Sequence, residues 1–389
     1  MLITRRTGLA AFAVAALFAT GAAAQDVVKI GLILPMTGPF ASTGKQVHAA
    51  VNLYMVEKGA SVAGKRIEVI LKDDTGVQPE TTKRLAQELI IQDKVSILAG
   101  FGLTPLARAT APIATQAKTP MLVMAAGTSI ITQDSPFILR TSFTLPQSAV
   151  VMAQWALKNN IKKVVSMVTD FAPGIDGETS FKSVFTAGGG EVVSALRTPL
   201  QNPDFAPFLQ RAKDAQPQAV FIFVPSGQGA AVMKQFNERG LGQAGIKLIG
   251  PGDVTDDDIL NGMGDPALGV ITAHFYSAAH PSPENKAYVA AFEKANPGMR
   301  PNFMSVGGWD GMHLIYETLK KTGGKVEGEA FVAAAKGMSW TSPRGPVKIE
   351  PDTRDITHNI YIRKVEKVGG KLYNVEFDKI DMVKDPMKK

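Results

Sequence analysis

The chain has 389 residues, of which 45% are hydrophobic and 20% charged, and its formal charge is +7. Such a composition excludes an intrinsically disordered protein and is typical of a globular chain long enough for two domains. Because the chain contains no cysteine, disulfides, thiolate metal sites and a lipid-anchored bacterial lipoprotein are excluded as well.

The first 24 residues have the pattern of a cleavable signal peptide. Arg5 and Arg6 precede an apolar stretch, Gly8–Ala19, and the small residues Ala22–Ala24 form the expected cleavage site. This stretch is too short to span a membrane, and no later stretch is long enough. We therefore expect a mature protein in the periplasm, starting near Gln25, with the general secretory and twin-arginine export routes both open. For an exported chain with scattered lysines, the positive charge does not indicate a nucleic-acid partner.

Short runs of valine, isoleucine and leucine alternate with helical stretches through the first third of the chain. We predict strands at Val27–Leu34, Arg66–Lys72, Val95–Ala99 and Met121–Met124, with helices near Gly44–Lys58, Pro79–Gln92 and Pro105–Gln116. Such alternation is typical of βαβ units and predicts a parallel sheet.

A second alternating series follows the first. It predicts helices near Gln147–Asn159, Gly174–Ala187, Asp204–Ala215 and Gln228–Arg239, with strands at Lys163–Thr169, Glu191–Ala195, Ala219–Val224 and Lys247–Gly250. Because one sheet would be too wide for all these strands, we predict two α/β domains.

The last third of the chain breaks this order. A strand is predicted at Gly269–Phe275, followed by two helices at Pro283–Ala295 and Phe303–Thr322. After Gly345 we expect antiparallel strands at Pro346–Glu350, Asn359–Val368 and Lys371–Phe377, the last two joined as a hairpin at Gly369-Gly370.

Two neighbouring strands of the first series end in loops of small residues that carry hydroxyl groups. Thr104 follows one strand, and Thr128 and Ser129 follow the next. Ligands bind at the carboxyl ends of parallel strands, so both loops are expected at one edge of the sheet. With Thr104 as helix N-cap and Pro105 at the first helical position, free backbone amides would face an anion such as a carboxylate. Either loop alone would be an ordinary strand–helix turn.

Sequence motifs for catalysis are incomplete. The segment GPFASTGKQ (residues 38–46) is one residue too long for a phosphate-binding loop, and Gln46 stands where that loop needs a hydroxyl. No G-x-S-x-G motif occurs, and the five histidines lack the spacing of metal ligands. We therefore expect no catalytic residue, no metal and no cofactor. An exported α/β enzyme acting on a small carboxylate is the alternative from another class.

Several segments occur in an order and spacing that together are specific. They include KIGLILPMTGPFASTGK, RIEVILKDDTGVQPE, GFGLTP, AAGTS, FILRTSF, VVSMVTDFAPG, AVFIFVPSGQGAAVMKQFNERG, WDGMHLIYETLKKTG and RGPVKIEPDTRD. In these segments, from Lys29 to about Phe377, the chain resembles the periplasmic solute-binding proteins of branched-chain amino acid type ABC importers.

This resemblance implies two Rossmann-like lobes that close on a small solute like a clamshell. The lobes would be residues 26–144 plus 279–343 and residues 145–278 plus 344–389, with hinge crossings near Phe143–Pro146, Phe275–Ala278 and Ser342–Gly345. The closed protein, expected to be a monomer, would dock on permease subunits in the inner membrane without changing the solute chemically. Feeding a separate receptor remains a further alternative.

The resemblance also implies which residues contact the solute. The expected contacts are Phe101, Thr104, Ala126, Thr128, Ser129, Phe171, Ser226 and Asp253. Thr104, Thr128 and Ser129 would hold a carboxylate, and Phe101 would form part of the pocket wall.

Departures from the family pattern concern the ammonium half of an amino-acid site. Near the first hinge, where the family carries an acid, this chain has Leu145 and Pro146. Asp253 lies one place beyond the family's second acid. The pair Gly307-Gly308 would leave room for a ring beside Met304. We hypothesise that the solute is a carboxylate without an α-ammonium group, such as a benzoate or hydroxycinnamate. The alternative is a branched-chain amino acid or amide whose ammonium pairs with Asp253.

Overall fold

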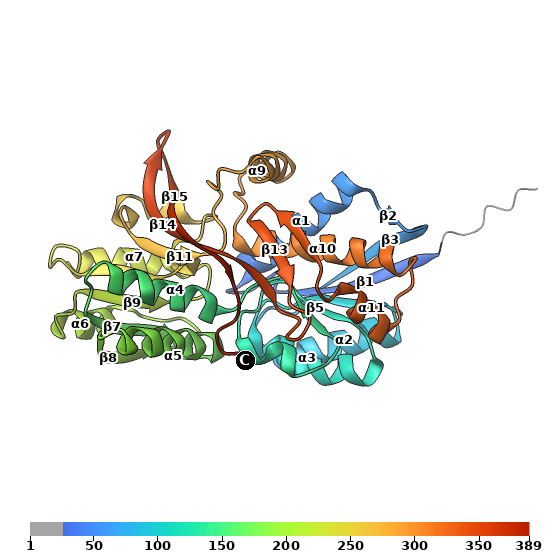
Figure 1. Cartoon of the computed structure of the whole chain (residues 1–389), viewed down its shortest axis with the longest axis horizontal. Helices are drawn as coiled ribbons and strands as arrows, with labels where there is room; N and C mark the ends of the chain where they lie inside the picture. The colour runs from blue at the N-terminus through green and yellow to red at the C-terminus, as the bar shows by residue number, and fades with distance from the viewer. Residues whose placement is uncertain (1–25, 389) are drawn as a thin grey trace, which may run out of the picture.

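The computed structural model describes residues 26–388, which form two lobes side by side, each built on its own sheet (Figure 1). The predicted signal peptide lies outside the described residues. Helices pack against the faces of both sheets, so the predicted α/β fold class is confirmed.

The first sheet has six strands within the described chain, in the order β2-β3-β1-β4-β5-β6. Its strands are β1 (Val27–Leu34), β2 (Ser61–Val62), β3 (Lys65–Asp73), β4 (Ile97–Gly100), β5 (Met121–Val123) and β6 (Ile138–Arg140). All neighbours run parallel except β2 and β3. The predicted adjacency of β4 and β5 is therefore confirmed, and their loops emerge at one edge.

Alternate side chains of these strands enter two separate cores. Leu32 packs with α1 and α10, whereas Ile33 packs with α2 and α3 on the other face. The helices that cover this sheet or extend the lobe are α1 (Ala41–Lys58), α2 (Pro79–Ile91), α3 (Thr104–Ala117), α9 (Pro283–Ala295), α10 (Phe303–Lys321) and α11 (Gly328–Ala335). The chain thus returns to the first lobe after completing the parallel part of the second.

The second sheet begins with parallel strands and ends with antiparallel ones. Its strands are β7 (Lys163–Thr169), β8 (Glu191–Thr198), β9 (Ala219–Phe223), β10 (Lys247–Pro251), β11 (Ile271–His274), β12 (Ser339–Ser342), β13 (Gly345–Ile349), β14 (Ile356–Val368) and β15 (Lys371–Val383). The predicted hairpin of β14 and β15 is confirmed, and its two turn glycines have φ angles of 56° and 81°, as a tight primed turn requires. β15 runs six residues beyond the predicted end at Phe377 because β14 continues to pair with it.

Five helices of the described chain accompany the second sheet. They are α4 (Leu145–Lys158), α5 (Ala172–Ala187), α6 (Ala206–Asp214), α7 (Gly229–Glu238) and α8 (Leu260–Met263). Thr144 is the N-cap residue of α4, and its backbone amide donates to the Gln147 side chain at 2.8 Å. This cap fixes the start of α4 directly beside the first predicted hinge crossing.

Residues from the three predicted crossings pack together between the lobes. The ring of Phe143 lies 5.1 Å from that of Phe275, and the guanidinium of Arg344 lies 4.7 Å from the Phe275 ring. Arg344 also donates hydrogen bonds to the carbonyls of Thr141 and Ser142, at 2.5 and 2.8 Å. One buried cation therefore ties these segments to each other.

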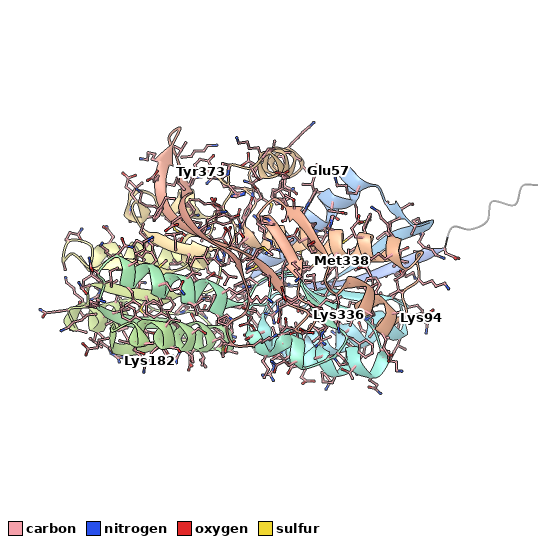
Figure 2. The ribbon with its side chains drawn as sticks, viewed as in Figure 1. Glu57, Lys94, Lys182, Lys336, Met338 and Tyr373 are labelled. Atoms are coloured by element: carbon pink, nitrogen blue, oxygen red, sulfur yellow. The ribbon has the colours of Figure 1, made fainter. Side chains whose placement is uncertain are left out.

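A contact on the outer side also joins the two lobes. Arg300, just before α10, stacks on the ring of Tyr373 in β15 with 4.1 Å between guanidinium and ring centre. Figure 2 labels Tyr373 on the hairpin. The same guanidinium donates to the carbonyl of Leu372 at 2.7 Å. The segment that leads into α10 is thereby held against the β14–β15 hairpin.

Candidate functional site

A cavity lies where the carboxyl ends of the parallel strands of both sheets face each other. Apolar and aromatic side chains form most of its wall: Phe40, Leu103, Phe143, Leu145, Phe171, Phe223 and Met304. Its polar side chains are Thr43, Thr104, Ser226 and Asp253. With a volume of about 30 Å³, it is a narrow slot, so a ring enters only if the walls separate.

The Thr104 hydroxyl lies at the amino end of α3. The helix begins at Thr104 itself and Leu103 is its N-cap residue, so the predicted N-cap role of Thr104 is wrong by one position. Instead, the Thr104 hydroxyl lies 2.7 Å from that of Thr128, and both side chains are buried. A hydroxyl beside the free amides of a helix start remains suited to a carboxylate.

Ser129 does not line the cavity. Its hydroxyl donates to the carboxylate of Asp385, and its backbone amide donates to Asp176 at 2.9 Å. Asp176 lies on α5 of the second lobe, and Asp385 follows β15 at the end of the chain. No local sequence signal indicates these two partners, because they lie 47 and 256 residues away along the chain.

A buried charge network supports the loop after β5 from behind. Arg140 donates to the carbonyl of Thr128 at 2.7 Å and pairs with Asp355 at 2.9 Å. Lys388 also contacts Asp355, so the last described residue of the chain belongs to this network. The loop that carries Thr128 is therefore held by residues of both lobes.

The aromatic predictions divide into two outcomes. Phe101 is fully buried in the core between β4 and α3, with φ of 65°, and the expected place of its ring in the pocket wall is wrong. Phe171 lines the cavity, as does Ala126, and both stay predicted contacts of the solute. Phe171 stacks on Phe223, 5.9 Å between ring centres. Phe223 was missed, although its place at the end of a buried strand is the signal that marked the other loops.

The glycine pair of α10 serves close packing. A Cβ atom on Gly307 would lie 2.2 Å from the carbonyl oxygen of Met124, and one on Gly308 would lie 2.8 Å from that of Val47. The expectation that these glycines leave space for a solute ring is wrong. They let α10 approach β5 and α1.

Two acids of the second lobe lie beside the cavity in different environments. Burial raises the pKa of Asp253 to about 8, and its Oδ2 has no hydrogen-bond partner among the described residues. Burial also raises the pKa of Asp256 to about 7, although the Ser226 hydroxyl and the Asn302 amide both donate to its carboxylate. Asp256 is thus hydrogen-bonded within the protein, whereas Asp253 has one carboxyl oxygen without a hydrogen-bond partner in the described chain.

Side chains of the two lobes meet across the cavity. Asn302, which caps α10 of the first lobe, donates to both carboxylate oxygens of Asp256 at 2.9 and 3.0 Å. Ser42 of α1 donates to Asp258 at 2.9 Å. These bonds require the lobes to be close together, so the described conformation is a closed one.

Comparison with known proteins gives one family. The model of the family "Periplasmic binding protein" matches residues 27–371. "Leu/Ile/Val-binding protein homolog 6" of Brucella abortus (strain 2308) is 46% identical over 384 residues, covering 98% of this chain and 97% of the relative. No helix among residues 26–388 is long and apolar enough to cross a membrane.

Solved structures agree with the fold. A solute-binding protein of an ABC transporter from Rhodopseudomonas palustris BisB5, in complex with 3,4-dihydroxy benzoic acid, is 64% identical with a TM-score of 0.92. The alignment covers 94% of this chain and all of that one. Another from R. palustris, in complex with 4-hydroxybenzoate, is 42% identical with a TM-score of 0.90, covering 93% and 99%. The chain therefore belongs to the periplasmic binding protein family and is a solute-binding component of an ABC importer, which places it in the periplasm.

Proposed function

We propose that this protein captures a small aromatic carboxylate and delivers it to the permease of its importer. The observation that carries the proposal is a cavity walled by Phe40, Phe171 and Phe223, with the Thr104 hydroxyl at a helix start on one side. A ring fits the apolar wall and a carboxylate fits the hydroxyl and amides. Support also comes from the relatives of 64% and 42% identity, whose structures hold hydroxylated benzoic acids.

A branched-chain amino acid is the second candidate because the relative of 46% identity is named for leucine, isoleucine and valine. Asp253 would have to pair with the ammonium group. Burial of a cation is costly unless its partner is ionised. Since burial raises the pKa of Asp253 to about 8, its carboxyl holds its proton at neutral pH and favours the aromatic acid.

We propose that transport uses a hinge motion of the two lobes, residues 26–144 plus 279–343 against residues 145–278 plus 344–389. A solute that touches both lobes stabilises the closed form. The protein is proposed to act as a monomer, to leave the solute chemically unchanged, and to lose residues 1–24 on export. N-terminal sequencing of periplasmic protein and chromatography of the solute after incubation test the last two points.

A thermal-shift and calorimetry panel tests the proposed function. Benzoate, 4-hydroxybenzoate and 4-hydroxycinnamate are compared with leucine and valine. At 100 times the Kd, a bound aromatic acid is expected to stabilise the protein by about 2.7 kcal/mol. Stabilisation by leucine or valine, with none by the aromatic acids, would contradict the proposal.

Thr104→Val is expected to lower the affinity for an aromatic acid about 10- to 100-fold, because a hydrogen bond to a charged group contributes about 1.5–3 kcal/mol. Titration calorimetry measures the effect. Thr110→Val is the matched control: Thr110 is also buried in α3, but its hydroxyl donates to the Leu106 carbonyl within the helix. If Thr104→Val and Thr110→Val bind the aromatic acid with equal affinity, Thr104 does not contact the solute.

Ser42→Ala is expected to weaken solute binding about fivefold, because the variant loses one hydrogen bond of about 1 kcal/mol between the lobes. The partner, Asp258, is part-exposed and remains hydrated when the lobes separate. Calorimetry gives the affinity, and small-angle scattering gives the proportion of closed protein with the solute bound. An unchanged affinity would show that this contact does not help closure.

A further inference from the structure

Asp253 has an oxygen that the protein itself leaves without a partner. Among the described residues that line the cavity, it alone has a buried side-chain polar atom with no hydrogen-bond partner. The residue is 2% exposed, so bulk water does not replace the missing partner. Buried polar atoms are nearly always satisfied, and an exception in a ligand cavity points to the ligand as the partner.

Three donors of neighbouring segments are already engaged with other acceptors. The Ser226 hydroxyl donates to Asp256, as does the Asn302 amide. The guanidinium of Arg363 donates to Thr272, at 3.2 and 3.1 Å, and to the carbonyl of Tyr276. These donors therefore do not saturate Oδ2 of Asp253.

The chemistry of this oxygen selects the kind of partner. Burial raises the pKa of Asp253 to about 8, so a neutral carboxyl faces the cavity at pH 7. A neutral carboxyl both donates and accepts hydrogen bonds, and so does a hydroxyl group. A second carboxylate of the solute is disfavoured, because it would lie in a buried site beside Asp256 and Asp258.

The two polar ends of the cavity come from different lobes. Thr104 begins α3 on the first sheet, whereas Asp253 follows β10 on the second. A ring whose carboxylate lies at Thr104 presents its far edge to the second lobe. We propose that Asp253 binds a ring hydroxyl remote from the carboxylate, so that the protein selects hydroxylated aromatic acids over benzoate. This inference rests on the proposed function and adds a specificity-determining residue to it.

Titration calorimetry with three probes tests the inference: benzoate, 4-hydroxybenzoate and 2-hydroxybenzoate. The protein is expected to bind 4-hydroxybenzoate at least about 10-fold more tightly than benzoate, because benzoate leaves the buried carboxyl unpaired. 2-Hydroxybenzoate, whose hydroxyl lies beside its carboxylate, is expected to bind no better than benzoate. In Asp253→Leu the ratio of the 4-hydroxybenzoate and benzoate affinities is expected to fall to about 1. Asp253→Ala is expected to give the same ratio of about 1, and it replaces Asp253→Leu in the test if the larger side chain prevents folding.

Two results would overturn the inference. Equal affinities for benzoate and 4-hydroxybenzoate in the unaltered protein would do so, and so would a ratio that both Asp253 variants preserve. Both results leave aromatic-acid binding itself intact. If instead leucine binds, no aromatic acid does, and both variants lose leucine binding, then the proposed function fails and Asp253 pairs with an ammonium group.

Discussion

Arg344→Met is expected to lower the free energy of unfolding by about 3–5 kcal/mol, because it leaves a buried carboxylate without its counter-ion. Arg344 and Asp310 are both fully buried, with 2.6 Å between Nη2 and Oδ2. Trp340 and Ser342 also donate to Asp310, so the carboxylate stays in place when the arginine is removed. The variant further loses the bonds to the Thr141 and Ser142 carbonyls. Urea unfolding measures the change.

Lys320→Met is the control for this experiment. Lys320 pairs with Glu317 at 2.6 Å, but the lysine side chain is 57% exposed. An exposed pair of this kind contributes about 0–1 kcal/mol. If Arg344→Met costs no more than Lys320→Met, the buried pair is not what stabilises the region between the lobes.

Gly307→Ala is expected to destabilise the protein by about 3 kcal/mol and to weaken solute binding, because overpacking forces backbone shifts. The new Cβ would lie 2.2 Å from the Met124 carbonyl oxygen, a backbone atom that has no rotamer to change. Met124 leads directly into the loop that carries Ala126 and Thr128. Movement of α10 therefore displaces the site as well as the core. Denaturation and calorimetry give the two effects.

Gly262→Ala provides the matched comparison. Gly262 is also a helical glycine, in α8, and nothing lies within 4 Å of the position of a Cβ atom. Its replacement is expected to stabilise the protein by at most about 1 kcal/mol, through helix propensity alone. A Gly307→Ala protein as stable as this control would mean that α10 can shift without cost.

The sequence predicted the architecture because its signals are local. Buried strands such as β4 and β5 are continuous apolar runs, and the order of strands and helices allows few topologies. The hairpin of β14 and β15 followed from two consecutive glycines. Its full length did not, because the residues after Phe377 are mostly exposed and have no regular alternation of apolar and polar side chains, although they pair with β14.

The site was predictable only in part. Thr104, Ala126, Phe171, Ser226 and Asp253 line the cavity, since each follows a strand at the correct edge of a sheet. The orientation of a single side chain could not be predicted from the sequence, because it depends on one backbone angle or on one distant partner. Phe101 turns into the core at a positive φ, and Ser129 is bound by Asp385 from the opposite end of the chain. The hydrophobic periodicity of the sequence indicates neither the inward orientation of Phe101 nor the hydrogen bond of Ser129.

The end of the chain lies between the lobes, beside the loop that carries Ser129 (Figure 1). This placement affects how the protein can be handled as a reagent. A reporter domain or purification tag fused directly to the C-terminus would lie against Asp385 and Lys388. Trimming by a carboxypeptidase would remove these two residues, which contact Ser129 and Asp355. The start of the described chain is the safer point of attachment, because Asp26, directly before β1, is exposed. A biosensor built on this protein should therefore carry its fluorophore there or on α6, away from the chain terminus.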